Sequence, residues 1–372
     1  MPLFSFVPRL QHVESFLLLA AVGVDSLHVV VVLNAGQYAS GRPEVFQNPG
    51  RSAAETLYLV QHGTVLAVQV LLELLGPSLV LVAVQAILGT SAELADDNGL
   101  VFQPEIVFHL AAQPIVRRSY EEPVYTYETN VIGTVNVLEC IRRHDCVKAA
   151  VMITTDKVYD NLEDGHAYRE DERLDGYDPY SNSKSCASLA IHSYKRSFLD
   201  EKGVSVSDLR AGNVIGGGDY AADRILPDCV RSAQKAENVK VRNPHSVRPY
   251  QHVLEPLSAY LLVAQKTYED PSLAGTYNVG PDDSDAAETG RIADIFAEAW
   301  GEGIGWEAGN PDGPHEANYL RLSHEKITET FGWKPVWDIE EAVRKTVEWT
   351  KASDKKAETD REIEEFLKKA EY

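Results

Sequence analysis

The sequence has few cysteines, and they form no pattern. There are four in 372 residues, with no Cys-x-x-Cys pair and no regular spacing. No group of His, Cys and Asp residues has the spacing of a metal site. These absences argue against a disulfide framework and against bound zinc, and they favour reduced thiols in a cytoplasm. The four thiols belong to Cys140, Cys146, Cys186 and Cys229.

Basic residues are scarce as well. Lys and Arg number 35 against 56 Asp and Glu, so the formal net charge is −21. Nucleic acids and anionic membranes bind to basic surfaces, and this balance therefore argues against both partners. A nucleotide ligand remains compatible, because a few arginines and helix N-termini are enough to hold its phosphates.

A long hydrophobic run without polar residues is also missing. Phe16–Val24 is apolar but short, and no convincing cleavage site of small residues follows it. Val65–Gly89 is long enough to cross a bilayer, but it contains two glutamines, a glutamate and a proline. A membrane span is thus the less favoured alternative, and we expect a soluble chain.

The chain changes character near residue 100. The first hundred residues contain no Lys, Trp or Cys, and helical and strand periods are hard to separate there. Beyond that point apolar runs alternate with helical stretches, which is the pattern of an α/β protein. We expect buried strands at Glu105–Leu110, Ala149–Ile153 and Val204–Leu209, in a parallel sheet covered on both faces.

Helices are expected between and after these strands. Asp178 followed by Pro179 is typical of a helix N-terminus, and this helix should continue toward Phe198. The last twenty residues are rich in Lys and Glu, which indicates a solvated helix or a frayed tail. The other expected helices are Asn130–Arg143, Asp228–Lys235, Pro256–Tyr268, Gly290–Trp300 and Ile339–Lys351.

Two polar groupings can carry chemistry. Tyr180 and Lys184 are four residues apart and share one helix face, where an ammonium can lower the pKa of the phenol toward neutrality. Thr155, Asp156 and Lys157 directly follow a buried strand, and open α/β sheets bind their ligands at that edge. Taken alone, the first pair also fits a surface helix, and the second fits a loop with an exposed ion pair.

Five motifs in a fixed order carry a family resemblance. They are Glu105–Gln113 (EIVFHLAAQ), Thr129–Thr134 (TNVIGT), Thr155–Lys157 (TDK), Tyr180-xxx-Lys184 and Arg210–Asp219 (RAGNVIGGGD). Together they resemble the extended short-chain dehydrogenase/reductase family of NAD-dependent epimerases and dehydratases. Lys157 and the Arg242–Pro244 and Arg248–Val253 segments resemble its CDP-glucose 4,6-dehydratase branch. The resemblance covers residues 104–351.

The resemblance implies a Rossmann-like doubly wound parallel sheet and a redox-neutral reaction with NAD. CDP-glucose would be the substrate. Tyr180 would take the proton of the sugar 4-hydroxyl, and Lys184 would hold the cofactor ribose. Thr155 would bind the sugar 4-oxygen, Asp156 would protonate the leaving 6-hydroxyl, and Lys157 would act as the base at C5. Since a base must be neutral, Lys157 would need a lowered pKa.

The same resemblance implies binding residues outside this group. Leu110, Ala111, Ala112 and Gln113 would pass along NAD, and Asn130 would support their loop, although a helix cap is an alternative role for Asn130. Asn213, Arg242 and Arg248 would bind the nucleotide and its pyrophosphate, and His315 would lie in a substrate segment. His252 fits a core or loop histidine better than a ligand. Family members commonly form homodimers through a helix pair.

The domain organisation follows from these assignments. Residues 104–215 would form the remaining Rossmann half, 216–351 a smaller α/β region for the nucleotide-sugar, and 352–372 a charged tail. Residues 1–103 stand where the first Rossmann half belongs, yet they lack its Gly-x-x-Gly-x-x-Gly turn. The nearest candidate is the strand Val29–Leu33 followed by Asn34–Gly41, whose glycines have the wrong spacing.

Three explanations of this atypical segment remain open. The segment is a frameshifted or mis-assembled sequence, a diverged first half of the Rossmann domain, or part of a non-catalytic relative that binds nucleotide-sugars without a working NAD site. Another nucleotide-sugar dehydratase or epimerase is the alternative activity.

Overall fold

The computed structural model describes residues 17–24, 27–34, 79–84, 104–310 and 317–370. Its centre is a seven-stranded sheet in the order β11-β6-β5-β4-β2-β1-β3. The strands are β1 (Leu17–Val24), β2 (Leu27–Asn34), β3 (Leu79–Val84), β4 (Ile106–His109), β5 (Ala149–Ile153), β6 (Ser205–Ala211) and β11 (Thr276–Val279). The three strands expected after residue 104 are thus confirmed.

The sheet is parallel from β2 to β11 but not throughout. β2 pairs in parallel with β4, whereas β1 runs antiparallel to both β2 and β3. The parallel pairing expected for the strands at Glu105–Leu110, Ala149–Ile153 and Val204–Leu209 is confirmed, and both antiparallel pairs of this sheet involve β1. Only two residues separate β1 from β2, and a connection that short joins antiparallel strands, since parallel ones need a crossover of a dozen residues or more.

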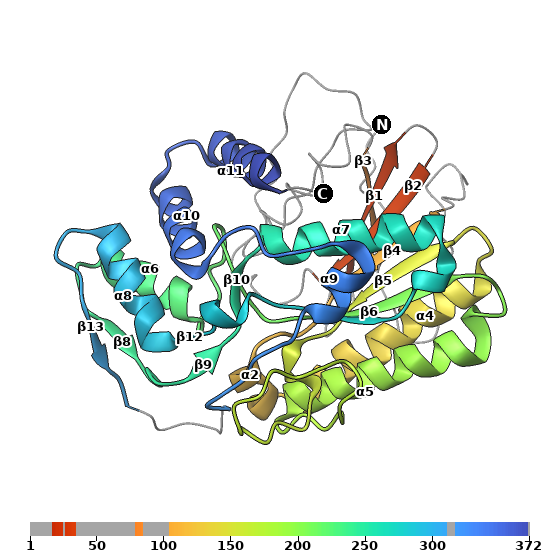
Figure 1. Cartoon of the computed structure of the whole chain (residues 1–372), viewed down its shortest axis with the longest axis horizontal. Coiled ribbons are helices and arrows are strands. Elements are labelled where there is room, and N and C mark those ends of the chain that lie inside the picture. The colour runs from red at the N-terminus through yellow and green to blue at the C-terminus, as the bar shows by residue number, and fades with distance from the viewer. Residues whose placement is uncertain (1–16, 25–26, 35–78, 85–103, 311–316, 371–372) are drawn as a thin grey trace, which may run out of the picture.

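Apolar side chains on both faces explain the unbroken hydrophobic strands. Phe108 and Val151 point to the face covered by α7 (Leu254–Glu269), in a cluster that also contains Trp333 and Trp337. Alternate residues such as Met152 point to the other face, against α4 (Gly133–Arg143) and α5 (Pro179–Tyr194). Figure 1 shows α4 and α5 side by side below the sheet and α7 across it.

The segments around α4 and α5 begin and end close to where the sequence predicts. α4 (Gly133–Arg143) follows a π-helical turn at Glu128–Ile132. α5 (Pro179–Tyr194) continues as a second such turn to Leu199. Asp178 caps α5, because its carboxylate accepts a hydrogen bond from the Ser181 amide at 3.0 Å. Two short helices, α2 (Val116–Glu121) and α3 (Pro123–Tyr127), precede them.

A smaller α/β region lies beside the sheet (Figure 1). Its core joins apolar side chains of α6, α8 and α10, among them Cys229, Phe296 and Val343. Three two-stranded sheets complete it, β7 with β10, β8 with β13, and β9 with β12. The bounds are α6 (Ile225–Gln234), α8 (Thr289–Trp300), α10 (Ile339–Lys351), β7 (Asn213–Ile215), β8 (Val239–Val241), β9 (Val247–Arg248), β10 (Tyr250–His252), β12 (Ala287–Glu288) and β13 (Trp306–Ala308). α9 (Glu325–Phe331) packs on α7 and β11.

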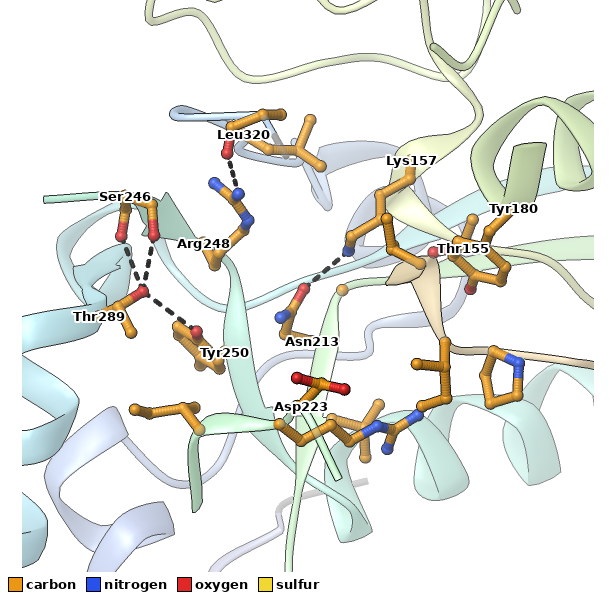
Figure 2. A pocket seen from close by; sticks show the side chains of 18 of the residues that line it. Thr155, Lys157, Tyr180, Asn213, Asp223, Ser246, Arg248, Tyr250, Thr289 and Leu320 are labelled. Atoms are coloured by element: carbon orange, nitrogen blue, oxygen red, sulfur yellow. Dashed lines mark hydrogen bonds between the residues drawn. The ribbon is translucent and has the colours of Figure 1, made fainter. Parts of the chain in front are cut away.

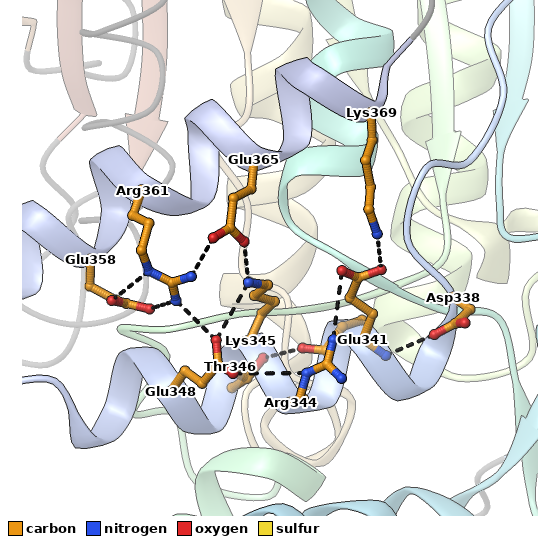
Figure 3. Close-up of polar contacts among 11 residues, drawn as sticks. Asp338, Glu341, Arg344, Lys345, Thr346, Glu348, Glu358, Arg361, Glu365 and Lys369 are labelled. Atoms are coloured by element: carbon orange, nitrogen blue, oxygen red, sulfur yellow. Dashed lines mark hydrogen bonds and ion pairs between the residues drawn. The ribbon is translucent and has the colours of Figure 1, made fainter.

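The expectation of a solvated or frayed C-terminal tail is only partly right. A helix forms, α11 (Lys355–Lys369), but it packs on the protein and buries Ile363 and Phe366. Ion pairs hold it to α10 (Figure 3): Arg361 contacts Glu348 at 2.9 Å, and Lys369 contacts Glu341 at 2.6 Å. The abundant charges thus pair between two helices while a narrow apolar stripe faces the core.

Candidate active site

A cavity of about 670 Å³ lies where β5 and β6 end, between the sheet and the smaller α/β region. Its volume falls within the range of small-molecule binding sites. The sheet contributes Ile153–Thr155 and Ala211–Asn213 to its wall, and the smaller region contributes Arg242, Arg248 and Tyr250. This is the strand edge at which the sequence predicts a ligand.

The segment after β5 gathers three predicted residues around one carboxylate. Asp156 is fully buried, and its Oδ1 accepts hydrogen bonds from Thr155 Oγ1 and from Lys157 Nζ, both at 2.8 Å. Its Oδ2 is buried without a hydrogen-bond partner among the described residues. Lys157 also donates to Asn213 Oδ1 at 2.8 Å, as Figure 2 shows. Thr155, Lys157 and Asn213 line the cavity, whereas Asp156 lies behind its wall.

Tyr180 enters the cavity from the first turn of α5, beside Thr155 (Figure 2). A glycine allows this close placement. A Cβ at Gly176 would lie 2.4 Å from the Ser181 carbonyl carbon and 2.7 Å from the Lys157 carbonyl oxygen. The absence of a side chain at Gly176 therefore lets the start of α5 pack directly on the segment after β5.

The electrostatics of Tyr180 differ from the sequence-based expectation. Burial raises the pKa of Tyr180 to about 12, while the hydrogen bond with Thr155 and the charge of Arg224 act in the opposite direction. Lys184, the residue expected to lower this pKa, instead donates its ammonium proton to the Ile153 carbonyl at 3.0 Å. The predicted pKa near neutrality is therefore wrong for this structure, because desolvation of the phenolate is the larger effect.

Lys184 itself is buried and does not line the cavity. Burial lowers the pKa of Lys184 to about 8, and the carboxylate of Asp208 acts against this shift. His109, at the end of β4, feels the charge of Lys184, and burial together with that charge lowers the pKa of His109 to about 3. A buried ammonium thus lies at the carboxyl ends of the central strands.

Asn130 holds the loop that the sequence predicts to pass along the cofactor, and this loop lies outside the cavity wall. The Asn130 side chain holds the backbone of Gln113: its Oδ1 accepts a hydrogen bond from the Gln113 amide at 2.8 Å, and its Nδ2 donates one to the Gln113 carbonyl at 3.1 Å. Asn130 also donates to Ser183 Oγ at 2.9 Å, which ties the loop to α5. Leu110, Ala111, Ala112 and Gln113 follow β4 but do not contribute to the cavity lining.

Four arginines also line the cavity. Arg242 pairs with Asp223 at 2.6 Å, and Arg248 is buried and donates to the carbonyls of Val247 and Ala317. Two further arginines were missed from the sequence. Arg117 lies 3.8 Å from Asp223, and Arg224 contacts Asp219 at 3.0 Å. An Arg-Ile-Leu-Pro-Asp stretch after the glycine-rich segment was the available signal for Arg224.

Some predicted features fall outside the described residues. His315 is one, and so is the glycine-containing segment after β2, although β2 itself forms where Val29–Leu33 predicts a strand. Within the described ranges, no cluster of three or more His, Cys, Asp or Glu side chains could hold a metal ion. Among these same residues, no helix is long and apolar enough to cross a membrane.

Known proteins share this fold and these sequence features. A sequence model of the family described as GDP-mannose 4,6 dehydratase matches residues 100–346. The CDP-glucose 4,6-dehydratase of Salmonella typhimurium is 48% identical over 257 residues, which cover 68% of this chain and 72% of that protein. The dTDP-glucose 4,6-dehydratase of Streptomyces antibioticus is 28% identical over 72% of this chain and 76% of its own length.

A solved structure agrees with these relatives. The UDP-glucose 4-epimerase of Thermus thermophilus, in complex with NAD, is similar with a TM-score of 0.60 at 27% identity, over 68% of this chain and 79% of its own. The Rossmann-like fold inferred from the sequence is thereby confirmed, as is the break near residue 100, where the family match begins. The chain belongs to the GDP-mannose 4,6 dehydratase family.

Proposed function

We propose that this chain is a CDP-glucose 4,6-dehydratase, which converts CDP-glucose to CDP-4-dehydro-6-deoxyglucose and water. One observation carries the proposal: a single cavity is lined by Thr155, Lys157 and Tyr180 from the side of the main sheet and by Arg242 and Arg248 from the smaller α/β region. The first group suits a sugar with several hydroxyls, and the arginines suit a pyrophosphate. The 48% identity to the Salmonella typhimurium enzyme supports cytidine as the base.

The described residues fit the nicotinamide end of NAD by their chemistry. A phenol and an ammonium one helical turn apart, Tyr180 and Lys184, lie at the strand ends beside a loop that Asn130 fixes. We propose that Lys184 holds the cofactor ribose and that residues 110–113 lie along the cofactor. When bound, NAD would supply the hydride acceptor for C4 and the hydride donor for C6.

Tyr180 is the proposed proton acceptor for the sugar 4-hydroxyl. Its position in the cavity beside Thr155 lets both hydroxyls reach one substrate oxygen. Because burial raises the pKa of Tyr180 to about 12, the phenolate is scarce at neutral pH. Arg224, whose charge lowers that pKa, is the group that favours the phenolate from the cavity side.

Asp156 and Lys157 are the proposed acid and base of the elimination. In the ion pair the proton is on Lys157, whereas the elimination needs a protonated acid, Asp156, and a neutral base, Lys157. Transfer of one proton across the 2.8 Å contact from Lys157 Nζ to Asp156 corrects both at once. Lys157 then takes the C5 proton. Asp156 lies behind the cavity wall, so its proton reaches the leaving 6-hydroxyl through the Thr155 hydroxyl 2.8 Å away, and the hydroxyl departs as water. Asn213 keeps the Lys157 nitrogen in place at 2.8 Å.

We further propose that residues 216–351 mainly hold the nucleotide-sugar, that Asn213, Arg242 and Arg248 bind its pyrophosphate, and that His315 is one of the substrate-binding residues. Residues 104–215 supply the reacting groups, and residues 352–372 form a charged segment. The free thiols of Cys140, Cys146, Cys186 and Cys229 support a cytoplasmic location.

A homodimer is the proposed assembly. Exposed apolar side chains lie on the helical face formed by α3, the turn before α4, and α5: Val124 is 69% exposed, Ile132 43% and Leu189 53%. Such side chains on neighbouring helices suit a helix pair from a second copy. Sedimentation of the purified chain and of Leu189→Glu tests this assignment. A wild-type chain of monomer mass would contradict the homodimer, and equal masses for both at dimer size would contradict this face as its interface.

The activity is tested by incubating the purified full chain and added NAD with CDP-glucose, dTDP-glucose or UDP-glucose in turn. Mass spectrometry should show the loss of one water from CDP-glucose above all. Loss of water from dTDP-glucose alone would overturn the assigned base. A folded chain that binds CDP-glucose without turnover would support the non-catalytic alternative instead.

A further inference from the structure

A buried ion pair lies within β6, directly behind the candidate active site. Arg210 is 0% exposed and Asp208 1%, and Arg210 Nε contacts Asp208 Oδ2 at 3.3 Å. Burying two charges in a strand is costly unless each finds further partners. Both do, and their partners lie on the elements that carry the reacting groups.

Asp208 connects the end of β5 to the middle of α5. Its Oδ1 accepts from Thr154 Oγ1 at 2.6 Å, and its Oδ2 accepts from Ser188 Oγ at 2.5 Å. Thr154 directly precedes Thr155 of the cavity, and Ser188 is one helical turn beyond Lys184. Asp208 therefore fixes the distance between the segment after β5 and the helix of Tyr180 and Lys184.

Arg210 holds the other end of the same segment. Its Nη1 donates to the Tyr159 hydroxyl at 2.9 Å, and its Nη2 donates to Ser188 Oγ at 2.9 Å. Tyr159 is 1% exposed and in turn donates to Asn278 Oδ1 on β11 at 2.6 Å. The ion pair thus contacts both residues that flank the segment from Thr155 to Val158.

We propose that Asp208 and Arg210 are positioning residues, which hold Thr155–Lys157 in register with Tyr180 and Lys184. The inference rests on the proposed function for its catalytic consequence. Neither residue lines the cavity, so they act through Thr154, Tyr159 and Ser188 rather than on the substrate. Small displacements of reacting groups have large effects on the rate, whereas binding depends on many contacts.

The pair also bears on the charge of Lys184. Among the described residues, His109 on β4 and Asp208 on β6 are the ionisable groups that interact with Lys184 electrostatically, and Tyr180 lies one turn before it on the same helix. Asp208 is the carboxylate among them and raises the pKa of Lys184, which burial lowers. Without the Asp208 charge, Lys184 should lose its proton at a lower pH.

The test compares three variants of the full chain. Ser188→Ala removes the hydroxyl shared by both charges, and Asp208→Asn removes the charge that faces Lys184. Leu138→Ala is the control: Leu138 is fully buried under the sheet in α4, does not line the cavity, and should lower stability without moving the active-site segment. Readouts are kcat and KM for CDP-glucose, the pH dependence of kcat, and amide hydrogen exchange of residues 154–159.

We expect Ser188→Ala to lower kcat about tenfold with KM within about twofold, and to speed exchange at residues 154–159. Asp208→Asn should do the same and shift the alkaline break of the kcat profile to lower pH. If both behave like Leu138→Ala, the inference is wrong. If Asp208→Asn fails to fold, Ser188→Ala decides. A wild-type chain without turnover would refute the proposed function, while the exchange measurement would still test the positioning role.

Discussion

Replacing Glu362 by Gln should stabilise the protein at alkaline pH. Glu362 lies on the inner face of α11, is 1% exposed, and neither of its carboxylate oxygens has a hydrogen-bond partner among the described residues. The nearest basic group inside is His252, with its Nε2 3.9 Å away, but burial lowers the pKa of His252 to about 3 and leaves it neutral. Among the described residues, no charged group forms a hydrogen bond with this buried acid.

The magnitude follows from the acidity of this group. Burial raises the pKa of Glu362 from 4.5 to about 8, with the charge of Glu358 acting in the same direction and that of Lys345 against it. Between pH 4.5 and about 8 the folded protein keeps a proton on Glu362 that the unfolded chain releases. The stabilising effect of the neutral acid is therefore complete below about pH 4.5 and is lost as the pH rises through about 8. A tenfold change in acidity is worth about 1.4 kcal/mol, so the ceiling is about 5 kcal/mol. Water entry around the ionised group reduces it, and we expect about 2 kcal/mol.

Urea unfolding at pH 6 and pH 9, followed by tryptophan fluorescence, measures the effect. Trp337 reports on the site, because its ring contacts both His252 and Phe366. Glu362→Gln should reduce the decrease in the free energy of unfolding between pH 6 and pH 9. Glu365→Gln is the matched control on the same helix, where hydrogen bonding to Lys345 lowers the pKa of Glu365, and it should leave the loss unchanged. An equal loss of stability in wild type and Glu362→Gln would refute the reasoning.

Three further predictions concern catalysis. Tyr180→Phe should abolish turnover of CDP-glucose with little loss of binding measured by calorimetry, since it removes a proton acceptor and little contact area; retained turnover would exclude the base assignment. Lys157→Met should slow the elimination more than the oxidation at C4, so that reduced cofactor accumulates in stopped-flow absorbance; unchanged turnover would show that another group removes the C5 proton. The kcat of the wild type should rise with pH, because burial raises the pKa of Tyr180 to about 12 and the phenolate becomes more abundant. It should level off above about pH 8, where Lys184 loses its proton. A profile already flat from pH 6 would show that neither the raised pKa of Tyr180 nor the lowered pKa of Lys184 governs catalysis.

The parts of the fold that could be predicted are those with strong local signals. The apolar run Ala149–Ile153 forms a strand with the expected bounds, and Asp178 with Pro179 marks the start of α5. The packing of α11 could not be predicted in the same way, because it depends on contacts between segments whose own sequences do not specify a partner, such as the pairing of Arg361 with Glu348. β1 was not predicted because helical and strand periods are hard to separate in the first hundred residues.

The candidate active site also combines features that local sequence patterns predict with features that depend on tertiary packing. Spacing placed Tyr180 and Lys184 on one helix face, and strand order brought Thr155 and Lys157 to one edge. The acidity of Tyr180 was mispredicted, because burial is a property of the packed protein and outweighs the hydrogen bond with Thr155 and the charge of Arg224. The contact between Lys157 and Asn213 joins residues 56 positions apart, which no local pattern reveals.

The central claim is that one cavity oxidises C4, eliminates water and returns the same hydrogen to C6. CDP-glucose carrying deuterium at C4 tests it most directly, with the full chain, NAD and mass spectrometry combined with NMR of the product. The account predicts a 4-dehydro-6-deoxy sugar with deuterium at C6 and no net reduction of cofactor. Recovery of CDP-glucose unchanged, or of a product whose C6 carries only solvent hydrogen, would contradict it.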